Sequence, residues 1–337
     1  MKKYFILLSA TLCAVCFSCS SSPDSSNDEP PVNPPVTEDP ETPKVTDVTD
    51  KNSVAINGEE LIVSQDLTRG GAICYISKKG AATNIVNIAD EGRYIQQSYY
   101  AGNNLDRRDE GQGPSWSPWP WNPIQVGDYK RNRAKILKAT IEGNTTYVKC
   151  TPMLWDMDNK PAEATMEQWT TLEGNTIHVK NRLTCYRTDD IYDEGILRDQ
   201  EVPAVYVISS LKKLYAYTGD KPFTGDSYQQ LEVVQLTDNP NGGGGVWGRY
   251  HDVPEQWMAF VNDSDWGLAV YSPSATEFAA GRSDSQTNGT STSPSTSYIA
   301  PIKKERLMKN SVVEYEYYLI VDNMDNIRKR IYEIKGI

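Results

Sequence analysis

The chain has 337 residues, of which 38% are hydrophobic, and a formal net charge of −11. Its isoelectric point is near 4.9. An excess of acidic side chains repels nucleic acid and anionic membrane surfaces, so neither is expected as a partner. The length accommodates one large domain. No repeat of fixed period is present, which disfavours a propeller.

The N-terminus has the pattern of a bacterial lipoprotein signal peptide. Met1-Lys2-Lys3 precedes an apolar run over residues 4–17, and Cys19 follows it directly. The run is shorter than the roughly 20 residues that cross a bilayer. The pattern predicts a signal peptide over residues 1–18 and Cys19 as the lipid-modified first residue of the mature protein. The alternative is ordinary cleavage near this point and a free secreted protein.

A polar stalk is predicted over residues 19–51. It consists mainly of Ser, Pro, Asp, Glu, Thr and Asn, so it cannot bury enough apolar surface to offset the entropy of ordering. The acidic cluster of Asp24, Asp28 and Glu29 resembles the export signal of surface lipoproteins in Bacteroidetes. That resemblance implies a lipid-anchored protein of the outer membrane, at the cell surface or on the periplasmic face. The folded domain is then expected over residues 52–337.

Short runs rich in β-branched and aromatic residues, parted by turn signals, predict antiparallel strands through most of the domain. They are expected at 53–56, 60–64, 72–77, 84–88, 94–100, 134–141, 146–152, 164–172, 176–185, 201–208, 213–217, 230–235, 256–262, 267–272, 298–302 and 312–321.

Turns and one helix complete the prediction. Hairpin turns are expected at 142–144 and 173–175. Loops are expected at 102–113, 242–245 and 283–297. The glycine run at 242–245 is either a hinge or a slack connector. Ile327, Ile331 and Ile334 predict a terminal helix that Asp325 or Asn323 caps. Parallel sheets need crossover helices, so the fold class is all-β with antiparallel sheets.

Three tryptophans between residues 116 and 121 form the most distinctive segment. Prolines separate Trp116, Trp119 and Trp121, which makes the segment a poor core strand. Flat aromatic rings pack well on sugar rings, and nearby amides and charges orient the hydroxyl groups. The predicted glycan-binding residues are Arg93, Gln97, Trp119, Trp121, Asn122, Gln125, Arg249 and Trp257.

The hairpin at 165–179, the segment 265–271 and the long strand at 312–321 together resemble galactose mutarotase-like proteins, the β-supersandwich group. This group includes sugar epimerases and domains of glycoside hydrolases and polysaccharide lyases. The resemblance, from about Gly71 to Asp322, implies a large curved antiparallel sandwich with a carbohydrate cleft. The chain has two histidines, His178 and His251, and neither falls on the family's catalytic pair. The resemblance therefore does not imply the mutarotase reaction.

Acid–base work on sugars needs carboxylates, histidine or tyrosine with tuned pKa values. Glu201 is the first candidate, at a predicted strand start, where the alternative is a solvated rim residue. Asp128 is the second, directly after the tryptophan segment, where the alternative is a plain turn residue. His251 is the third, because it lies beside Arg249, Tyr250 and Asp252. His178 alternates within a strand and is interpreted as a surface or structural histidine.

These candidates leave two reactions open. A lyase acting on uronic acids would use His251 or Tyr250 as base, with Arg249 or Arg93 facing the carboxylate. A hydrolase would pair Glu201 with a second carboxylate, for which Asp128, Asp252 and Glu255 are the candidates.

No metal or cofactor is predicted. The acidic residues from Asp156 to Lys160 lack the glycine of a calcium loop. No zinc spacing or phosphate-binding glycine motif is present. Cys74, Cys150 and Cys185 are expected to be buried small residues, with one bridge open as an alternative.

The sequence thus predicts an extracytoplasmic carbohydrate-active enzyme that cleaves a polysaccharide or oligosaccharide, either a lyase or a glycoside hydrolase. The alternative is a non-catalytic surface glycan-binding lipoprotein. A third interpretation is a scaffold module in which Trp119 and Trp121 are buried.

Overall fold

The computed structural model describes residues 43–337, except 193–195, 237–246 and 285. Residues Pro43–Ile337 form one compact unit. The predicted signal peptide, Cys19, the stalk up to residue 42 and the glycine run at 242–245 lie outside the described residues.

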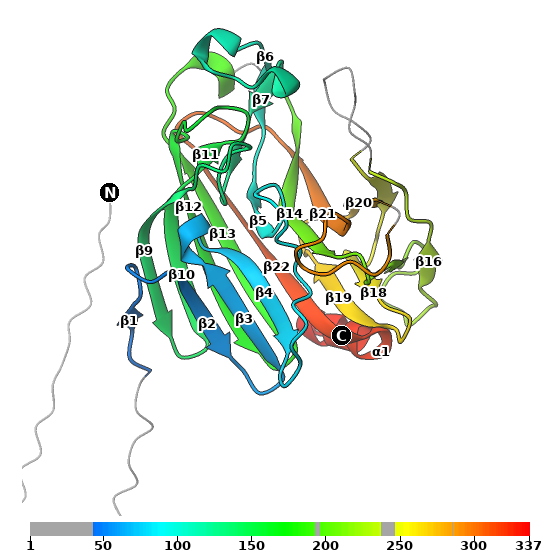
Figure 1. Cartoon of the computed structure of the whole chain (residues 1–337). Helices are drawn as coiled ribbons and strands as arrows, with labels where there is room; N and C mark the ends of the chain where they lie inside the picture. The colour runs from blue at the N-terminus through cyan, green and yellow to red at the C-terminus, as the bar shows by residue number, and fades with distance from the viewer. Residues whose placement is uncertain (1–42, 193–195, 237–246, 285) are drawn as a thin grey trace, which may run out of the picture. The chain divides into compact units, whose positions relative to one another are not determined.

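The described residues form two large antiparallel sheets, each with ten strands (Figure 1). The first sheet has the strand order β1 (Thr46–Asp47), β9 (Lys135–Glu142), β10 (Thr145–Thr151), β12 (Ala164–Glu173), β13 (Thr176–Cys185), β22 (Val312–Asn323), β19 (Trp266–Tyr271), β18 (Trp257–Val261), β15 (Lys213–Ala216) and β16 (Gln229–Leu231).

The second sheet carries the candidate site. Its order is β17 (Arg249–Asp252), β20 (Glu277–Ser283), β21 (Thr296–Glu305), β14 (Arg198–Ile208), β5 (Ile95–Ser98), β4 (Ala72–Lys78), β3 (Leu61–Asp66) and β2 (Ser53–Asn57), with β8 (Pro123–Ile124) and β11 (Met153–Leu154) attached beside β5. A separate ribbon pairs β6 (Ala101–Leu105) with β7 (Trp119–Trp121). The short 3₁₀ turns are η1 (Leu67–Arg69), η2 (Arg108–Glu110), η3 (Pro114–Trp116) and η4 (Asp190–Tyr192).

The main core lies where the two sheets pack against each other. Strand β13 shows the reason: Ile177, Val179 and Leu183 alternate with polar residues, and all three are buried in this core. Phe278 of β20 and Ile299 of β21 face them from the second sheet. Side chains of a strand point alternately to its two faces, so this pattern alone fixes which face of β13 turns inward.

The predicted all-β class is confirmed, and most predicted strands are present. Strand β13 has the predicted bounds, whereas residues 84–88 contribute only a bridge at Val86. The predicted strands do not include β6, which overlaps the predicted loop at 102–113, or β7, β8, β11, β17 and β20. In β20, Ala279, Ala280 and Gly281 have low strand propensity, and pairing with β21 overrides it.

The folded unit begins before the predicted boundary at residue 52. Thr46 and Asp47 pair with Ile141 and Thr140 of β9. The backbone of Val48 then donates to the carbonyl of Ala139 at 2.9 Å. The segment after Pro43 is therefore an edge strand of the first sheet rather than part of a stalk.

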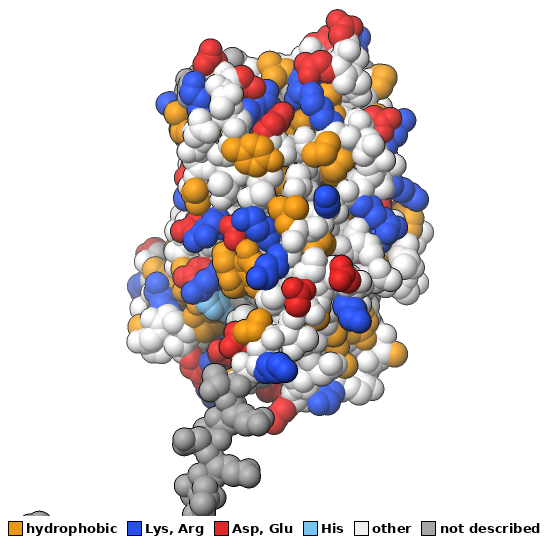
Figure 2. All heavy atoms as spheres, turned by 90° about the vertical axis from the view of Figure 1, so that its left-hand side faces the viewer, with side chains coloured by type: hydrophobic (Ala, Val, Ile, Leu, Met, Phe, Trp, Pro, Cys, Tyr) orange, Lys and Arg blue, Asp and Glu red, His pale blue; other side chains and the backbone are white. Residues whose placement is uncertain are grey.

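On the side shown in Figure 2, acidic and basic side chains are interspersed, and no large patch of one sign gathers there. Cross-strand ion pairs such as Arg182 with Glu314 link β13 and β22 of the first sheet. His178 pairs across the same two strands. Its Nε2 lies 2.9 Å from Glu316, and its ring stacks on Tyr318 at 4.3 Å, in line with the interpretation of a structural histidine.

Cys74, Cys150 and Cys185 are free, so the open alternative of a bridge among them is not realised. Desolvation raises the pKa of each thiol to about 12. The three side chains therefore act as small apolar groups.

Helix α1 (Met324–Lys335) covers part of the outer face of the first sheet. The Asn323 side chain caps it by accepting from the backbone nitrogen of Asn326 at 3.0 Å. Ile327 and Ile331 are buried against strands β18, β19 and β22, as the spacing predicts. No helix among the described residues combines the length and apolarity that a membrane span requires.

One buried carboxylate holds α1 in place. Glu255 is 0% exposed. It accepts from Arg328 Nη2 at 2.7 Å and from Arg328 Nε at 3.1 Å. The Trp257 indole donates to it at 2.9 Å and the Tyr332 hydroxyl at 2.7 Å. Burial alone would raise the pKa of Glu255, but these donors together hold it below its ordinary value.

We expect Glu255→Gln to lower the free energy of unfolding by about 3–5 kcal/mol, because it leaves the Arg328 guanidinium, 12% exposed, without its partner charge. Glu333→Gln is the matched control. Glu333 lies on the same helix, is 47% exposed, and should cost less than about 1 kcal/mol. Urea denaturation of both variants measures the difference. Equal losses would show that the Glu255 network does not anchor the helix.

Candidate functional site

The candidate site is built on strand β14, at a β-bulge. Pairing with β21 shifts register between Glu201 and Val205. Pairing with β5 shifts there too, since Glu201 faces Ser98 while Ala204 faces Gln96. A bulge inserts one residue and reverses the alternation beyond it. It places Glu201 on the same face as Tyr206, away from the main core.

The bulge also accommodates Pro203, which cannot donate to a ladder. The strand begins at Arg198, so Pro203 is not near its first position and Glu201 is not at a sheet rim. The alternative of a solvated rim glutamate is wrong as well, because Glu201 is only 8% exposed.

Glu201 is surrounded by hydroxyl groups. The Tyr298 hydroxyl donates to its Oε1. The Tyr100 hydroxyl donates to its Oε2 at 3.2 Å, and Ser98 is the third partner. Burial raises the pKa of Glu201, while these hydrogen bonds lower it by less, so the net shift is upward. Among the residues that the structure describes, no cation pairs with this carboxyl group, so no opposite charge offsets the desolvation.

A second carboxylate lies two residues away on the same face. The Asp199 Oδ2 accepts from the Tyr250 hydroxyl at 2.9 Å. Glu277 of β20 pairs with Ile302 of β21, and Ile302 pairs on its other side with Glu201. The Glu277 carboxylate also forms an ion pair with Lys304 at 3.1 Å. We call this group the carboxyl face, made of Asp199, Glu201, Tyr250, Glu277 and Tyr298.

An aromatic strip leads to the carboxyl face. The Tyr100 ring meets Trp119 edge-on at 6.4 Å, Trp119 meets Trp116 at 5.1 Å, and Trp116 meets Trp155 at 5.4 Å. All four rings are half-buried. Tyr100 connects the strip to the carboxyl face, because its hydroxyl is bonded to Glu201. The half-buried rings and the acid are therefore contiguous.

More aromatic rings and a cation are connected to Glu201 through Tyr298. Tyr206 packs on Tyr298 at 5.0 Å, and its hydroxyl accepts from the indole of Trp247, an exposed residue, at 3.1 Å. The Arg93 guanidinium lies over the Tyr206 ring at 5.7 Å. Of the predicted binding residues, Arg93 and Trp119 therefore contact tyrosines near Glu201, Tyr206 and Tyr100 respectively, rather than Glu201 itself.

Four other predicted binding residues are buried rather than presented at a surface. Trp121 is enclosed beside Tyr192. Asn122 accepts from the Trp119 indole at 3.3 Å and so supports the aromatic strip from beneath. Gln97 and Gln125 are buried inside the sandwich, where the Gln97 amide nitrogen donates to the backbone oxygen of Glu167 at 3.1 Å.

Asp128 is buried and organises a loop. Its Oδ1 accepts from the backbone of Lys130 and Asn132, both at 2.9 Å, and its Oδ2 accepts from the Asn159 backbone at 2.7 Å. This is the turn role that was the alternative for this residue. The structure does not bring Asp128 to the carboxyl face.

His251 and Arg249 point the other way from Glu201. His251 pairs with Phe278, which is in the main core, whereas Tyr250 pairs with Ala279 on the face of Glu201. Desolvation, with the charge of Arg249 as a second cause, lowers the pKa of His251. Arg249 is paired with Glu232 at 2.8 Å. Trp257 is buried beneath α1.

The sequence interpretation missed Asp199 and Tyr298. Asp199 has a local signal, because it lies two residues before Glu201 and shares its face if the strand is extended backward by three residues. Tyr298 has no such signal. It lies 97 residues from Glu201 along the chain and reaches it only through the pairing of β14 with β21.

Among the described residues, no group of three or more His, Cys, Asp or Glu side chains is placed to hold a metal ion. Asp156 accepts instead from the Gln112 amide at 2.6 Å, and Asp158 from Asn132 at 3.0 Å.

No protein-family model matches the sequence, and no curated protein matches it. Solved structures with a similar arrangement include a galactose mutarotase related enzyme from Lactobacillus acidophilus, with 10% identity, 80% of this chain and 97% of that chain covered, and a TM-score of 0.47. A galactose mutarotase-like protein from Clostridium acetobutylicum has 7% identity, 84% and 99% coverage, and a TM-score of 0.44.

A 4-alpha-glucanotransferase from Thermococcus litoralis has 11% identity and a TM-score of 0.40, with 84% of this chain and 40% of that chain covered. Two of these three proteins carry the name of the group that the sequence resembles. Similarity this distant assigns no activity to the chain, which has to be inferred from the site itself.

Glu201 should make stability pH-dependent. Its pKa lies above the ordinary value of 4.5, so the unfolded chain releases this proton at lower pH than the folded chain. The stabilisation is fully present below about pH 4.5 and is lost as the pH rises through the raised pKa. Each unit of the shift corresponds to about 1.4 kcal/mol.

Urea denaturation between pH 4 and pH 8 tests this prediction against Glu201→Gln, whose amide cannot titrate. We expect the wild type to lose stability relative to the variant as the pH rises, since all other groups are shared. A constant difference across this range would show that Glu201 has an ordinary pKa.

Proposed function

We propose that this protein is a carbohydrate-active enzyme that hydrolyses glycosidic bonds at the carboxyl face. One observation carries the proposal: a buried carboxyl group with a raised pKa, Glu201, lies on the same strand face as a second carboxylate, Asp199. Glycoside hydrolysis uses two carboxyl groups, one that donates a proton and one that acts as an anion. The environment of each carboxyl group decides which of these two roles it takes.

Glu201 is the proposed general acid. It would donate its proton to the oxygen of the leaving group, with Tyr298 and Tyr100 orienting the carboxyl group through their hydrogen bonds. Asp199 is the proposed partner, acting on the anomeric carbon or on the attacking water, with Tyr250 holding it in place. Glu277, on the same face, is the second possible partner.

Hydrolysis is favoured over β-elimination for a physical reason. Elimination needs a base that removes a carbon-bound proton, and the sequence offered His251 or Tyr250. His251 shares its face of β17 with Phe278 of the main core rather than with Glu201. Burial, together with the bond to Asp199, raises the pKa of Tyr250. A neutral phenol is a poor base at neutral pH.

The aromatic strip is the proposed glycan contact. Trp116 and Trp119 are half-buried, and their ring contacts continue through Tyr100 to Glu201. Sugar rings stacked on them would extend toward the acid. Arg93 and Trp247 both contact Tyr206, which packs on Tyr298 beside the acid, so the proposed substrate is an oligosaccharide or polysaccharide that spans several rings.

We also propose an extracytoplasmic location, with the mature protein attached to the outer membrane through a lipid on Cys19. The basic start, apolar run and cysteine support this proposal.

A non-catalytic glycan-binding lipoprotein is the second candidate. The observation in its favour is that Tyr298 and Tyr206, both buried, cover Glu201, which leaves the acid 8% exposed. In that case the aromatic strip alone would contact the glycan.

The expected result of Glu201→Gln is a loss of about 10²–10⁴-fold in kcat with glycan affinity nearly unchanged. Asp199→Asn should reduce kcat comparably, whereas Trp119→Ala should mainly weaken binding. The assay measures the release of reducing ends from neutral and uronic-acid polysaccharides. The absorbance of unsaturated uronates is recorded in parallel.

Asp128→Asn serves as a control away from the carboxyl face and should leave kcat unchanged in protein that folds. Unsaturated products would show that the enzyme acts by elimination, which would contradict the proposed hydrolysis. Glycan binding without any turnover in the wild type would support the non-catalytic candidate.

A further inference from the structure

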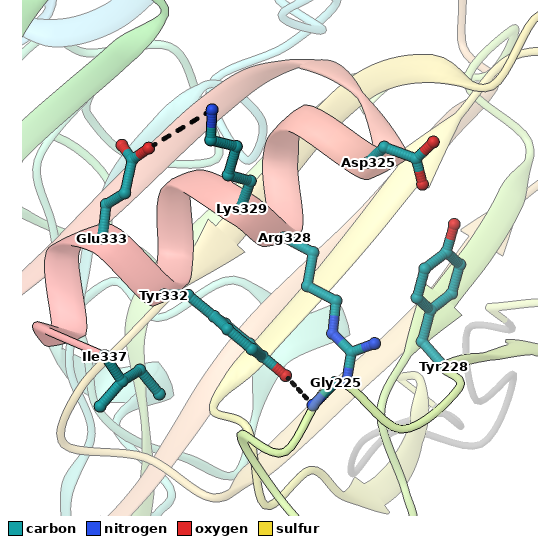
Figure 3. Close-up of a pocket in the computed structure, with 8 residues that line it drawn as sticks. All are labelled: Gly225, Tyr228, Asp325, Arg328, Lys329, Tyr332, Glu333 and Ile337. Carbon is teal, nitrogen blue, oxygen red and sulfur yellow. Dashed lines mark hydrogen bonds and ion pairs between the residues drawn. The ribbon is translucent and has the colours of Figure 1, made fainter.

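A pocket of about 490 Å³ lies between α1 and the loop before β16. Its lining includes Tyr228, Arg328 and Tyr332, with Asp325 toward the start of the helix and Lys329 and Glu333 toward its end (Figure 3). The volume falls within the range of small-molecule sites. Two aromatic residues and several polar groups therefore border one recess.

The centre of this pocket is rigid. The Arg328 guanidinium uses Nε and Nη2 to bond Glu255, which is fully buried. It lies over the rings of Tyr228 at 5.7 Å and Tyr332 at 5.3 Å. Figure 3 shows it between these two residues. Side chains held by buried partners keep their positions before a ligand arrives, which lowers the entropic cost of binding.

The ionisable side chains that line the pocket leave a small excess of negative charge. Asp325 and Glu333 are acidic, and Lys329 lies 3.9 Å from Glu333. The charge of Arg328 is already offset by Glu255. A site of this kind disfavours anions, yet it offers donors, acceptors and aromatic surface. That combination suits a neutral ligand with many hydroxyl groups.

The pocket is separate from the carboxyl face. Helix α1 packs on strands β18, β19 and β22 of the first sheet, whereas Glu201 is on the second sheet, on the face turned away from the main core. A ligand at one site therefore does not contact the other.

We infer that this pocket is a second saccharide-binding site, specific for a neutral sugar unit that contacts Tyr228 and Tyr332. The inference goes beyond the proposed hydrolysis and does not depend on it. The site would hold a glycan chain while another part of it, or another chain, occupies the carboxyl face.

The structure provides a reporter for the test. The Trp257 indole nitrogen bonds Glu255 at 2.9 Å, and its ring lies 5.9 Å from that of Tyr228. Its ¹⁵N–H resonance, assigned with Trp257→Phe, is followed in the full chain during titration with the methyl glycosides of glucose, galactose and mannose. Methyl glucuronide is the charged comparison.

We expect at least one neutral glycoside to shift the Trp257 resonance in a saturable way, with weaker binding of the glucuronide. Tyr228→Ala should weaken this binding about tenfold or more. Tyr228→Phe should retain it, because the ring remains. Glu201→Gln should leave it unchanged, so failure of the hydrolysis proposal is distinguishable from failure of this one.

Three outcomes would overturn the inference. No neutral glycoside shifts the resonance, the shift persists undiminished in a folded Tyr228→Ala variant, or methyl glucuronide binds more tightly than every neutral glycoside.

Discussion

Strand β14 is the element on which the arrangement of this protein depends, because both of its faces are buried. Val205 and Val207 belong to the main core, while Ala204 and Tyr206 pack on the opposite side with Tyr298. A strict alternation along the whole strand would turn Glu201 to the core side with Val205. The bulge at Pro203 prevents this. An acid that would otherwise be buried among aliphatic side chains instead meets three hydroxyl groups.

Two glutamates show how the same residue type acquires different roles. Both Glu201 and Glu255 are buried. Glu255 receives two bonds from a guanidinium and stays ionised, so it ties a helix to a sheet. Glu201 receives only hydroxyl donors, so desolvation prevails and its pKa is raised. Burial alone therefore does not decide the direction in which the pKa of a buried glutamate shifts; the charge of its partners does.

Much of the fold follows from the sequence, since alternating apolar residues and Gly-containing turns mark β2, β3, β9, β10, β12 and β13. The spacing of the isoleucines likewise predicted α1. The site was harder to predict, because Tyr298 meets Glu201 only through long-range pairing. Trp121 and Trp257 resembled surface platforms, yet both are core residues. Their burial depends on how the ribbon β6–β7 and helix α1 pack against the rest of the domain, and the local composition does not determine that packing.

The short strand β1 has a consequence for how the molecule behaves among its own copies. It covers the end of β9 from Ala139 to Ile141, whose backbone would otherwise be an open border of the first sheet. An open border of this kind is a template for pairing with a second molecule. The residues just after Pro43 therefore shield this end of β9, and a chain shortened to the predicted start at Asn52 would leave its backbone groups open to pairing.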